Sequence, residues 1–216
     1  MLNLLIPSTL ETLYMVFLSA VFTVLLGLPL GIILVITSKG HILDWPALNK
    51  VLSIIVNVTR SLPFIILMIF IIPFTRLIAG TSIGTNATVV PLVVAAVPFF
   101  ARIVESALHE VDGGVIEAAI AMGAGPIDIV VRVLIPEALP SLILGTTITI
   151  INLLGYSAMA GTIGGGGIGD LAIRYGYHRF QTDVMIMTII VLIILVQGIQ
   201  VSGNLIAQNI LKHRRK

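Results

Sequence analysis

Long apolar segments constrain this chain more than any other feature of its sequence. Five segments dominated by Ile, Leu, Val and Ala cover residues 12–37, 52–77, 87–108, 139–159 and 184–210. A helix needs about 20 mostly apolar residues to cross the hydrocarbon core of a bilayer, and each segment meets this length. The pattern therefore predicts an all-α membrane protein with five transmembrane helices.

The low content of charged residues supports the same class. Charged residues make up 10% of the 216-residue chain and hydrophobic residues 57%, whereas an average soluble domain has about 25% charged residues. A soluble surface with so little charge would aggregate, which argues against a soluble domain with a large core. The chain has no cysteine, so disulfides, thiolate metal sites and a cysteine nucleophile are excluded.

The distribution of basic residues predicts the orientation in the membrane. If the N-terminus lies outside, the inner loops and the C-terminus contain Lys39, Lys50, Arg132, Lys212, Arg214, Arg215 and Lys216. The outer loops then contain only Arg174 and Arg179, while Arg60, Arg76 and Arg102 lie near helix ends. Lys and Arg concentrate in cytoplasmic loops, so the N-terminus is expected outside the cell and the C-terminus inside.

This topology divides the chain into a membrane domain at residues 8–207 and a basic tail at residues 208–216. The tail directly follows an apolar helix, which is typical of a cytoplasmic membrane anchor, so no nucleic-acid partner is expected. The membrane domain includes one long cytoplasmic loop, residues 109–138, where glycines, prolines and charged residues interrupt the apolar pattern.

The cytoplasmic loop is expected to form two short helices. The first, 115–122, has small or apolar residues at helical spacing and ends at Gly123, as helices commonly do at glycine. The second begins at Pro126, which suits a first helical turn. It is expected to stop at residue 134, ahead of Pro136, because the residue before proline is disfavoured in α geometry. Such short helices are marginal alone, so they pack either on their own bundle or in a partner's groove.

The loop resembles the EAA motif of ATP-binding-cassette (ABC) importer permeases. That motif consists of Glu-Ala-Ala, three residues, Gly, nine residues and Ile-x-Leu-Pro. This chain has Glu-Ala-Ala at 117–119, then Gly123, and then an apolar segment that ends at Pro136. It departs from the motif only at Val133 and Ile135, which are both apolar replacements.

In that family the loop is a coupling helix, which docks into a groove on a separate cytoplasmic ATPase. The resemblance implies that the Glu side chain engages basic or donor groups beside the groove. The two alanines permit a close approach, and the glycine permits the turn. The residues expected to couple the ATPase are Glu117, Ala118, Ala119, Met122, Gly123, Pro126 and Pro136.

A wider resemblance covers nearly the whole chain. Segments 60–84, 120–123, 134–140 and 155–177 look like the permease of methionine-uptake importers, and 155–177 is the most specific of them. The resemblance implies a type I ABC importer permease fold in the bacterial plasma membrane, and a homodimer that transports D- and L-methionine. It also implies two ATPase subunits that bind ATP and Mg²⁺, and an extracytoplasmic substrate-binding lipoprotein. A permease for another amino acid or small metabolite of the same importer class is the alternative.

Four residues of the fourth predicted span are candidates for the translocation pathway, namely Asn152, Tyr156, Ser157 and Met159. Polar groups at this depth usually face a cavity or the bundle interior, or they hold helices together, and the sequence leaves both roles open. Met is flexible and polarisable, so it adapts to changing neighbours. In a dimer, Met159 from each copy is expected to close an apolar gate.

Other chemistry finds little support in the sequence. Gly164, Gly166 and Gly169 match Gly-x-Gly-x-x-Gly, but nucleotide binding also needs a preceding strand, so we interpret the glycines as a tight loop with closely approaching chain segments. No Gly-x4-Gly-Lys-Ser/Thr motif is present, so no cofactor is expected in this chain. A zinc helix starting at His109 would need His at the position of Gly113, so no metal is expected. The spans offer no paired catalytic groups for an enzyme, and a scaffold would not need the helix–glycine–helix loop.

The first predicted span contains two glycines at the spacing that packs membrane helices closely, Gly27 and Gly31. Pro29 lies between them, and proline in a helix interior produces a kink. The sequence therefore favours a kink over close helix packing at this position.

Overall fold

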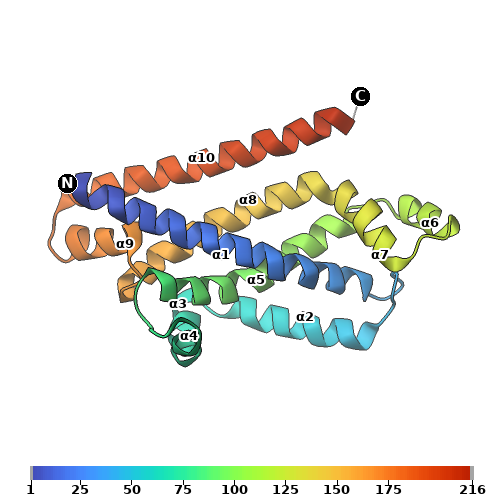
Figure 1. Cartoon of the computed structure of the whole chain (residues 1–216), viewed down its shortest axis with the longest axis horizontal. Coiled ribbons are helices and arrows are strands. Elements are labelled where there is room, and N and C mark those ends of the chain that lie inside the picture. The colour runs from blue at the N-terminus through green and yellow to red at the C-terminus, as the bar shows by residue number, and fades with distance from the viewer. Residues whose placement is uncertain (1, 215–216) are drawn as a thin grey trace. The chain divides into compact units, whose positions relative to one another are not determined.

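The structure, a computed structural model, describes residues 2–214 and places most of them in helices (Figure 1). The elements are α1 (Leu2–Ile36), α2 (Pro46–Ser61), α3 (Phe64–Phe70), α4 (Ile72–Ala79), α5 (Thr85–His109), α6 (Gly113–Ala121), α7 (Pro126–Ile129), the π-helix η1 (Val130–Leu134), α8 (Ile135–Ala160), the 3-10 helix η2 (Gly161–Ile163), α9 (Gly167–Leu171), the π-helix η3 (Ala172–Tyr177) and α10 (Thr182–Arg214). Within the described residues no strand is assigned, which confirms the all-α prediction. Two residues of the predicted basic tail, Arg215 and Lys216, lie outside this range.

Within residues 2–214, three helices are long and apolar enough to cross a membrane, namely α1 from Asn3 onward, α5 and α10. The consecutive helices α2 and α3 together form a fourth candidate, which is bent by 104° at its break. The predicted span 139–159 lies inside α8, a single helix of 26 residues. The structure therefore supports a helical membrane protein, while the count of five spans stays a prediction.

The second predicted span, 52–77, is wrong as a single helix, because α2, α3 and α4 divide this stretch. Pro63 lacks an N–H donor and pushes Leu62 out of α geometry, so α2 ends at Ser61. The next break falls at Ile71, two residues before Pro73. Prolines thus replace one straight span by a bent series of short helices.

The described chain forms two compact units, and several of the long helices contribute residues to both. Unit 1 contains the residues up to Thr23, Leu62–Ala96 and Ile148–Val201, and unit 2 contains Val24–Ser61, Val97–Thr147 and the residues from Ser202 onward. The candidate gate residues therefore belong to unit 1, and the candidate coupling residues belong to unit 2.

The core of unit 1 surrounds the C-terminal part of α8. Leu153 and Leu154 are buried together with Met15 of α1 and Leu92 of α5. Between membrane helices such contacts stabilise the fold through van der Waals packing. The end of α8 is consequently held by several elements of the unit.

The core of unit 2 includes a close contact between α1 and α5 at the two glycines, which the interpretation of the sequence did not favour. α1 continues as one helix through Pro29. A Cβ atom added to Gly31 would lie 2.5 Å from Cβ of Val104 and 2.7 Å from the carbonyl oxygen of Ala101. Gly27 meets α5 in the same way, one turn earlier. The glycines therefore let two helix backbones approach, as small residues do in membrane bundles.

Candidate functional site

Helix α6 is closed at both ends by well-defined hydrogen bonds. At its start, the Asp112 carboxylate accepts a hydrogen bond from the backbone N–H of Gly114 over 2.7 Å. At its end, Gly123 has a φ of +82°, its N–H donates to the Ile120 carbonyl (2.9 Å), and the N–H of Ala124 donates to the Ala119 carbonyl (3.0 Å). This pair of bonds is the Schellman motif, which requires a left-handed residue. The predicted helix end at Gly123 is confirmed, and the helix starts two residues earlier than predicted.

The second helix of the loop does not stop before Pro136, so that prediction is wrong. α7, η1 and α8 follow one another without a gap. Pro136 has no N–H to give to the carbonyl four residues earlier. The preceding residue, Ile135, donates instead to the carbonyl of Val130, five residues back. The chain therefore absorbs the missing donor in one wide π-helical stretch, a known way of continuing a helix through such a defect.

The loop is anchored by apolar side chains that point inward. Ala119 of α6 is only 4% exposed and Ile129 of α7 only 1%, and both belong to the core of unit 2 with Leu134. The resemblance implies that Ala119 permits a close approach to a partner. In this structure its small side chain packs inside the unit. Of the two alanines of the motif, Ala118 alone is exposed.

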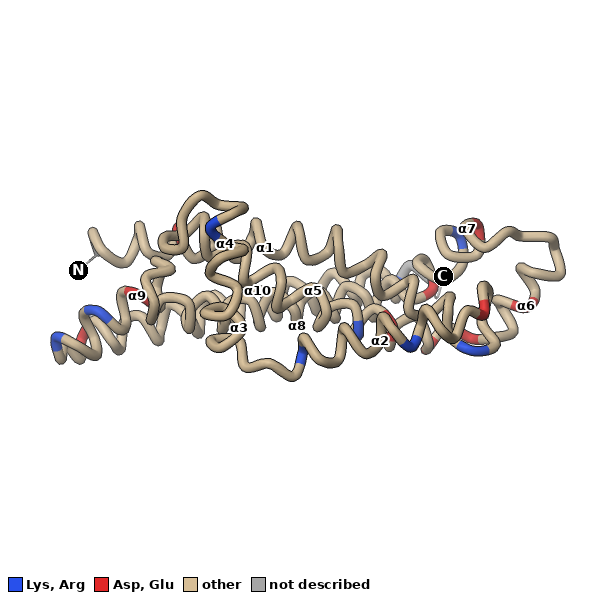
Figure 2. Tube along the Cα trace, turned by 90° about the horizontal axis from the view of Figure 1, so that it is seen from below, with Lys and Arg blue, Asp and Glu red and all other residues tan. Residues whose placement is uncertain are grey.

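Other apolar side chains of the loop point outward. Met122 is 83% exposed and Ile127 is 79% exposed, and the segment that contains them also carries acidic and basic residues (Figure 2). We define the coupling surface as the exposed side chains Val115, Glu117, Ala118, Ile120, Met122, Ile127 and Val131. Exposed apolar side chains in a loop of this kind are candidates for a protein–protein interface. Sequence reasoning missed Ile120, Ile127 and Val131, because apolar residues close to a helix end do not reveal which face they occupy.

The remaining loop residues frame this surface. Asp128 and Arg132 form an exposed ion pair, with 3.3 Å between a carboxylate oxygen and the guanidinium Nε. Pro126 opens α7 at its first turn, as predicted. Pro136 lies half-buried at the start of α8.

The four candidate pathway residues on α8 differ in exposure. Ser157 is buried, and its hydroxyl donates to the Leu154 carbonyl over 2.8 Å. Tyr156 is half-buried and stacks on Phe64, with 4.5 Å between ring centroids. Asn152 is half-buried. Met159 is 49% exposed, so it is the side chain of the four most available to a second chain or to the pathway.

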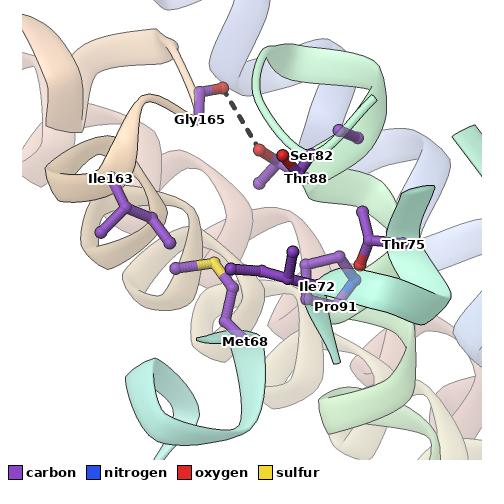
Figure 3. Close-up of a pocket in the computed structure, with 9 residues that line it drawn as sticks. Met68, Ile72, Thr75, Ser82, Thr88, Pro91, Ile163 and Gly165 are labelled. Carbon is purple, nitrogen blue, oxygen red and sulfur yellow. Dashed lines mark hydrogen bonds between the residues drawn. The ribbon is translucent and has the colours of Figure 1, made fainter. Parts of the chain in front are cut away.

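The glycine-rich loop after α8 is a site of close backbone approach, which confirms the interpretation of its glycines. A Cβ atom on Gly169 would overlap the backbone of Ala158. The hydroxyl of Thr88, on α5, faces the Gly165 carbonyl at 3.4 Å (Figure 3). Protein atoms thus occupy the space around these glycines that a bound phosphate would need.

A small cavity of about 10 Å³ lies beneath this loop (Figure 3). Its lining includes Met68, Thr75, Pro91 and Gly165. The Thr75 hydroxyl is buried and has no hydrogen-bond partner among the described residues. A cavity of this size holds about one water molecule, so it is too small for an amino-acid substrate.

Two histidines lie close together in unit 2, between the turn after α1 and the end of α5. The rings of His41 and His109 meet edge to face, with 6.0 Å between centroids. Burial, and then the neighbouring His109, lower the pKa of His41 below its ordinary value. No group of three or more potential ligands that could hold a metal ion occurs in the described part of the chain.

Residues 27–215 match the family described as binding-protein-dependent transport system inner membrane components. The match covers most of the chain, so the chain belongs to this family. It is therefore a membrane component of a transport system rather than an enzyme.

Individual proteins of known name are similar to this chain over most of its length. The chain is 50% identical over 208 residues to the probable D-methionine transport system permease protein MetI of Vibrio cholerae, with 96% of this chain and 92% of the relative covered. It is 53% identical over 161 residues to the D-methionine transport system permease protein MetI of Escherichia coli K12, which covers 74% of each. A solved structure of inward-facing conformations of the MetNI methionine ABC transporter matches with a TM-score of 0.96 and 49% identity over 97% of both chains.

Proposed function

We propose that this chain is the permease subunit of an ATP-driven ABC importer for methionine, in its D and L forms. The observation that carries this proposal is identity near 50% over almost the full length of a relative named for D-methionine transport. The match to a methionine transporter over 97% of the chain supports it. A permease for another amino acid or small metabolite of the same class is the second candidate.

The coupling surface is proposed to dock into a groove of the partner ATPase. Met122 and Ile127 lie on either side of the glycine turn. Their apolar side chains are exposed to water when the partner is absent and are buried when it docks. Glu117 is exposed beside them and engages a basic or donor group of the groove. Gly123, Pro126 and Pro136 shape the backbone. The interface has the form of a short helix in a partner's groove.

The same surface gives the ATPase a mechanical link to the membrane. A ligand shifts an equilibrium only by its different affinities for the two states. ATP and Mg²⁺ bind to the ATPase, so the closure that they favour reaches the permease through α6. Because Ala119 and Ile129 fix the loop in the core of unit 2, a push on α6 moves the unit rather than a loose loop.

We further propose that the membrane domain is residues 8–207, with five spans, an external N-terminus and the basic tail 208–216 in the cytoplasm. Two copies form a homodimer that encloses the pathway in the lipid bilayer. Two ATPase subunits bind from the cytoplasm, and an extracytoplasmic lipoprotein delivers the substrate. The concentration of Lys and Arg in the proposed inner loops supports this orientation.

Met159 is proposed to be the gate residue, with Asn152, Tyr156 and Ser157 on the same helix turns. Its exposure of 49% beside a tightly packed loop supports this role. Met159→Ala should loosen the closed pore, so that ATP hydrolysis continues without matching uptake. Unchanged ATP hydrolysis and unchanged uptake in this variant would argue against the gate.

Uptake measured with purified components tests the proposed substrate. The permease is reconstituted into vesicles with its ATPase and binding protein, and entry of radiolabelled D- and L-methionine is followed with and without ATP. ATP-dependent accumulation of methionine, not displaced by excess of other amino acids, is expected. ATP-dependent accumulation of a different amino acid, with none of methionine, would favour the second candidate.

A further inference from the structure

The first helix holds the glycine-rich loop through two side chains. A carboxylate oxygen of Glu11 accepts a hydrogen bond from the N–H of Gly167 over 2.8 Å, and the hydroxyl of Thr12 accepts one from the N–H of Ile168 over 2.8 Å. These N–H groups open α9, where an α-helix leaves its first donors without internal partners. All four residues belong to unit 1. We call these two contacts the Glu11–Thr12 clasp.

The two side chains are themselves oriented for this task. Thr12 is buried, and its hydroxyl donates to the Ser8 carbonyl over 3.0 Å. A hydroxyl that donates to one group keeps lone pairs for another, which leaves its oxygen free to accept from Ile168. Glu11 contributes an ionised acceptor, and hydrogen bonds to ionised groups are about twice as strong as neutral ones.

The glycines of the loop are shaped around the clasp. Gly166 and Gly167 have φ values of +79° and +78°. A Cβ atom on Gly167 would lie 2.5 Å from Oγ1 of Thr12, and one on Gly166 would lie 3.0 Å from Oε2 of Glu11. Both positions thus require glycine for two separate reasons, namely the left-handed backbone and the nearness of the clasp. The loop and the two α1 side chains fit each other.

The clasped helix rests directly on the end of α8. A Cβ atom on Gly169 would lie 2.5 Å from the Cα of Ala158, and one on Gly161 would overlap the backbone of Asp170. Backbone therefore touches backbone, with no flexible side chain between them. Ala158 is the neighbour of Met159, so a displacement of α9 shifts the segment that carries the gate residue.

We propose that Glu11 and Thr12 are positioning residues for the gate. By binding the N–H groups of Gly167 and Ile168, they fix α9 against α8 and hold Met159 in its closed position. This inference rests on the proposed gate, and it assigns the first helix a role that the coupling loop does not cover. Loss of the clasp frees α9 and loosens the end of α8.

A thiol reporter tests the inference without any measurement of transport. The chain has no cysteine, so Met159→Cys gives each permease copy a single thiol. Labelling of the permease band is then followed in the complete transporter in nanodiscs, without ATP. Adding Glu11→Ala should raise its labelling rate about tenfold, the change expected when one charge-assisted hydrogen bond that holds the closed state is lost. Glu11→Gln keeps an acceptor oxygen and should restore much of the protection. Thr12→Val should also raise the rate.

Asp183→Ala is the matched control, because it removes an exposed acidic residue from the same unit. Its labelling rate should equal that of the parent. Hydrogen exchange at Gly167 and Ile168 reports separately on the clasp. If Glu11→Ala unprotects these amides but leaves thiol labelling unchanged, the clasp is a local cap and the inference is wrong. If neither readout changes, the inference is also wrong.

The gate proposal fails differently from this inference. If Met159→Ala leaves uptake and ATP hydrolysis unchanged, the gate proposal is wrong, whatever the rate of thiol labelling. A faster thiol reaction in Glu11→Ala would in that case still establish that the clasp positions the end of α8.

Discussion

The left-handed glycine at the end of α6 offers a quantitative test of the coupling surface. Gly123→Ala forces a residue with a side chain into a φ of +82°. No atom lies within 4 Å of the added Cβ, so the cost is one of backbone conformation and not of steric overlap. A left-handed residue other than glycine costs about 1–2 kcal/mol. If the helix end relaxes when the ATPase is absent, docking has to restore the strained backbone. This cost would weaken docking of the ATPase by about 5–30-fold.

The assay is a titration of the ATPase against permease in nanodiscs at constant salt. Gly113→Ala is the matched control, because Gly113 lies in the same helix and its added Cβ also meets nothing within 4 Å. Gly113 is the first residue of α6 and is not among the glycines with positive φ, so alanine there causes no left-handed strain and this variant should bind as well as the parent. Gly123→Asn should fall between alanine and glycine, since Asn tolerates the left-handed region. Equal affinities for the two alanine variants would refute the reasoning.

Three further variants test the packing and the titratable groups. Gly31→Ala should lower the thermal midpoint through overpacking of about 1–3 kcal/mol. Gly198→Ala should not, because a Cβ atom added at that position meets no heavy atom within 4 Å; equal midpoints would contradict the helix contact. Thr75→Val removes a buried hydroxyl that has no hydrogen-bond partner among the described residues and should raise the midpoint. A lower midpoint would mean that the hydroxyl is bonded in solution. Because the pKa of His41 is lowered below 6.5, the unfolded chain binds more protons, so stability should fall as the pH drops through that value. His41→Gln should flatten this dependence between pH 7.5 and pH 5, and an unchanged slope would exclude His41 as its cause.

The sequence was most informative where one residue determines the local backbone. Gly123 ended a helix as expected, since a glycine with positive φ closes the end through local hydrogen bonds. The backbone at Pro63 and Pro136 was harder to predict, because the same missing N–H donor led to two different structures. At Pro63 the helix broke and the chain bent by 104°. At Pro136 the π-helix η1 carried the helix onward. Propensity alone does not choose between these two outcomes.

Contacts between distant segments were beyond the sequence for a physical reason. The pairing of Glu11 with Gly167 joins residues 156 positions apart. Gly31 likewise reads as a packing residue only once Val104 is known to face it. The burial of Ala119 and the exposure of Ile127 depend on which side of a short helix meets the core. Membership of the family was accessible from the motif spacing, while these roles required the fold.

The central claim is that α6 delivers the motion of the ATPase to the membrane through the coupling surface. The most direct measurement uses Met122→Cys in the cysteine-free chain, with a photo-crosslinker attached to its thiol in native membranes. The account predicts a covalent adduct with the ATPase. Phe180→Cys, at an 86% exposed residue in a proposed external loop, should give none. An intact complex in which position 122 fails to crosslink to the ATPase, or in which position 180 crosslinks equally well, would contradict the account.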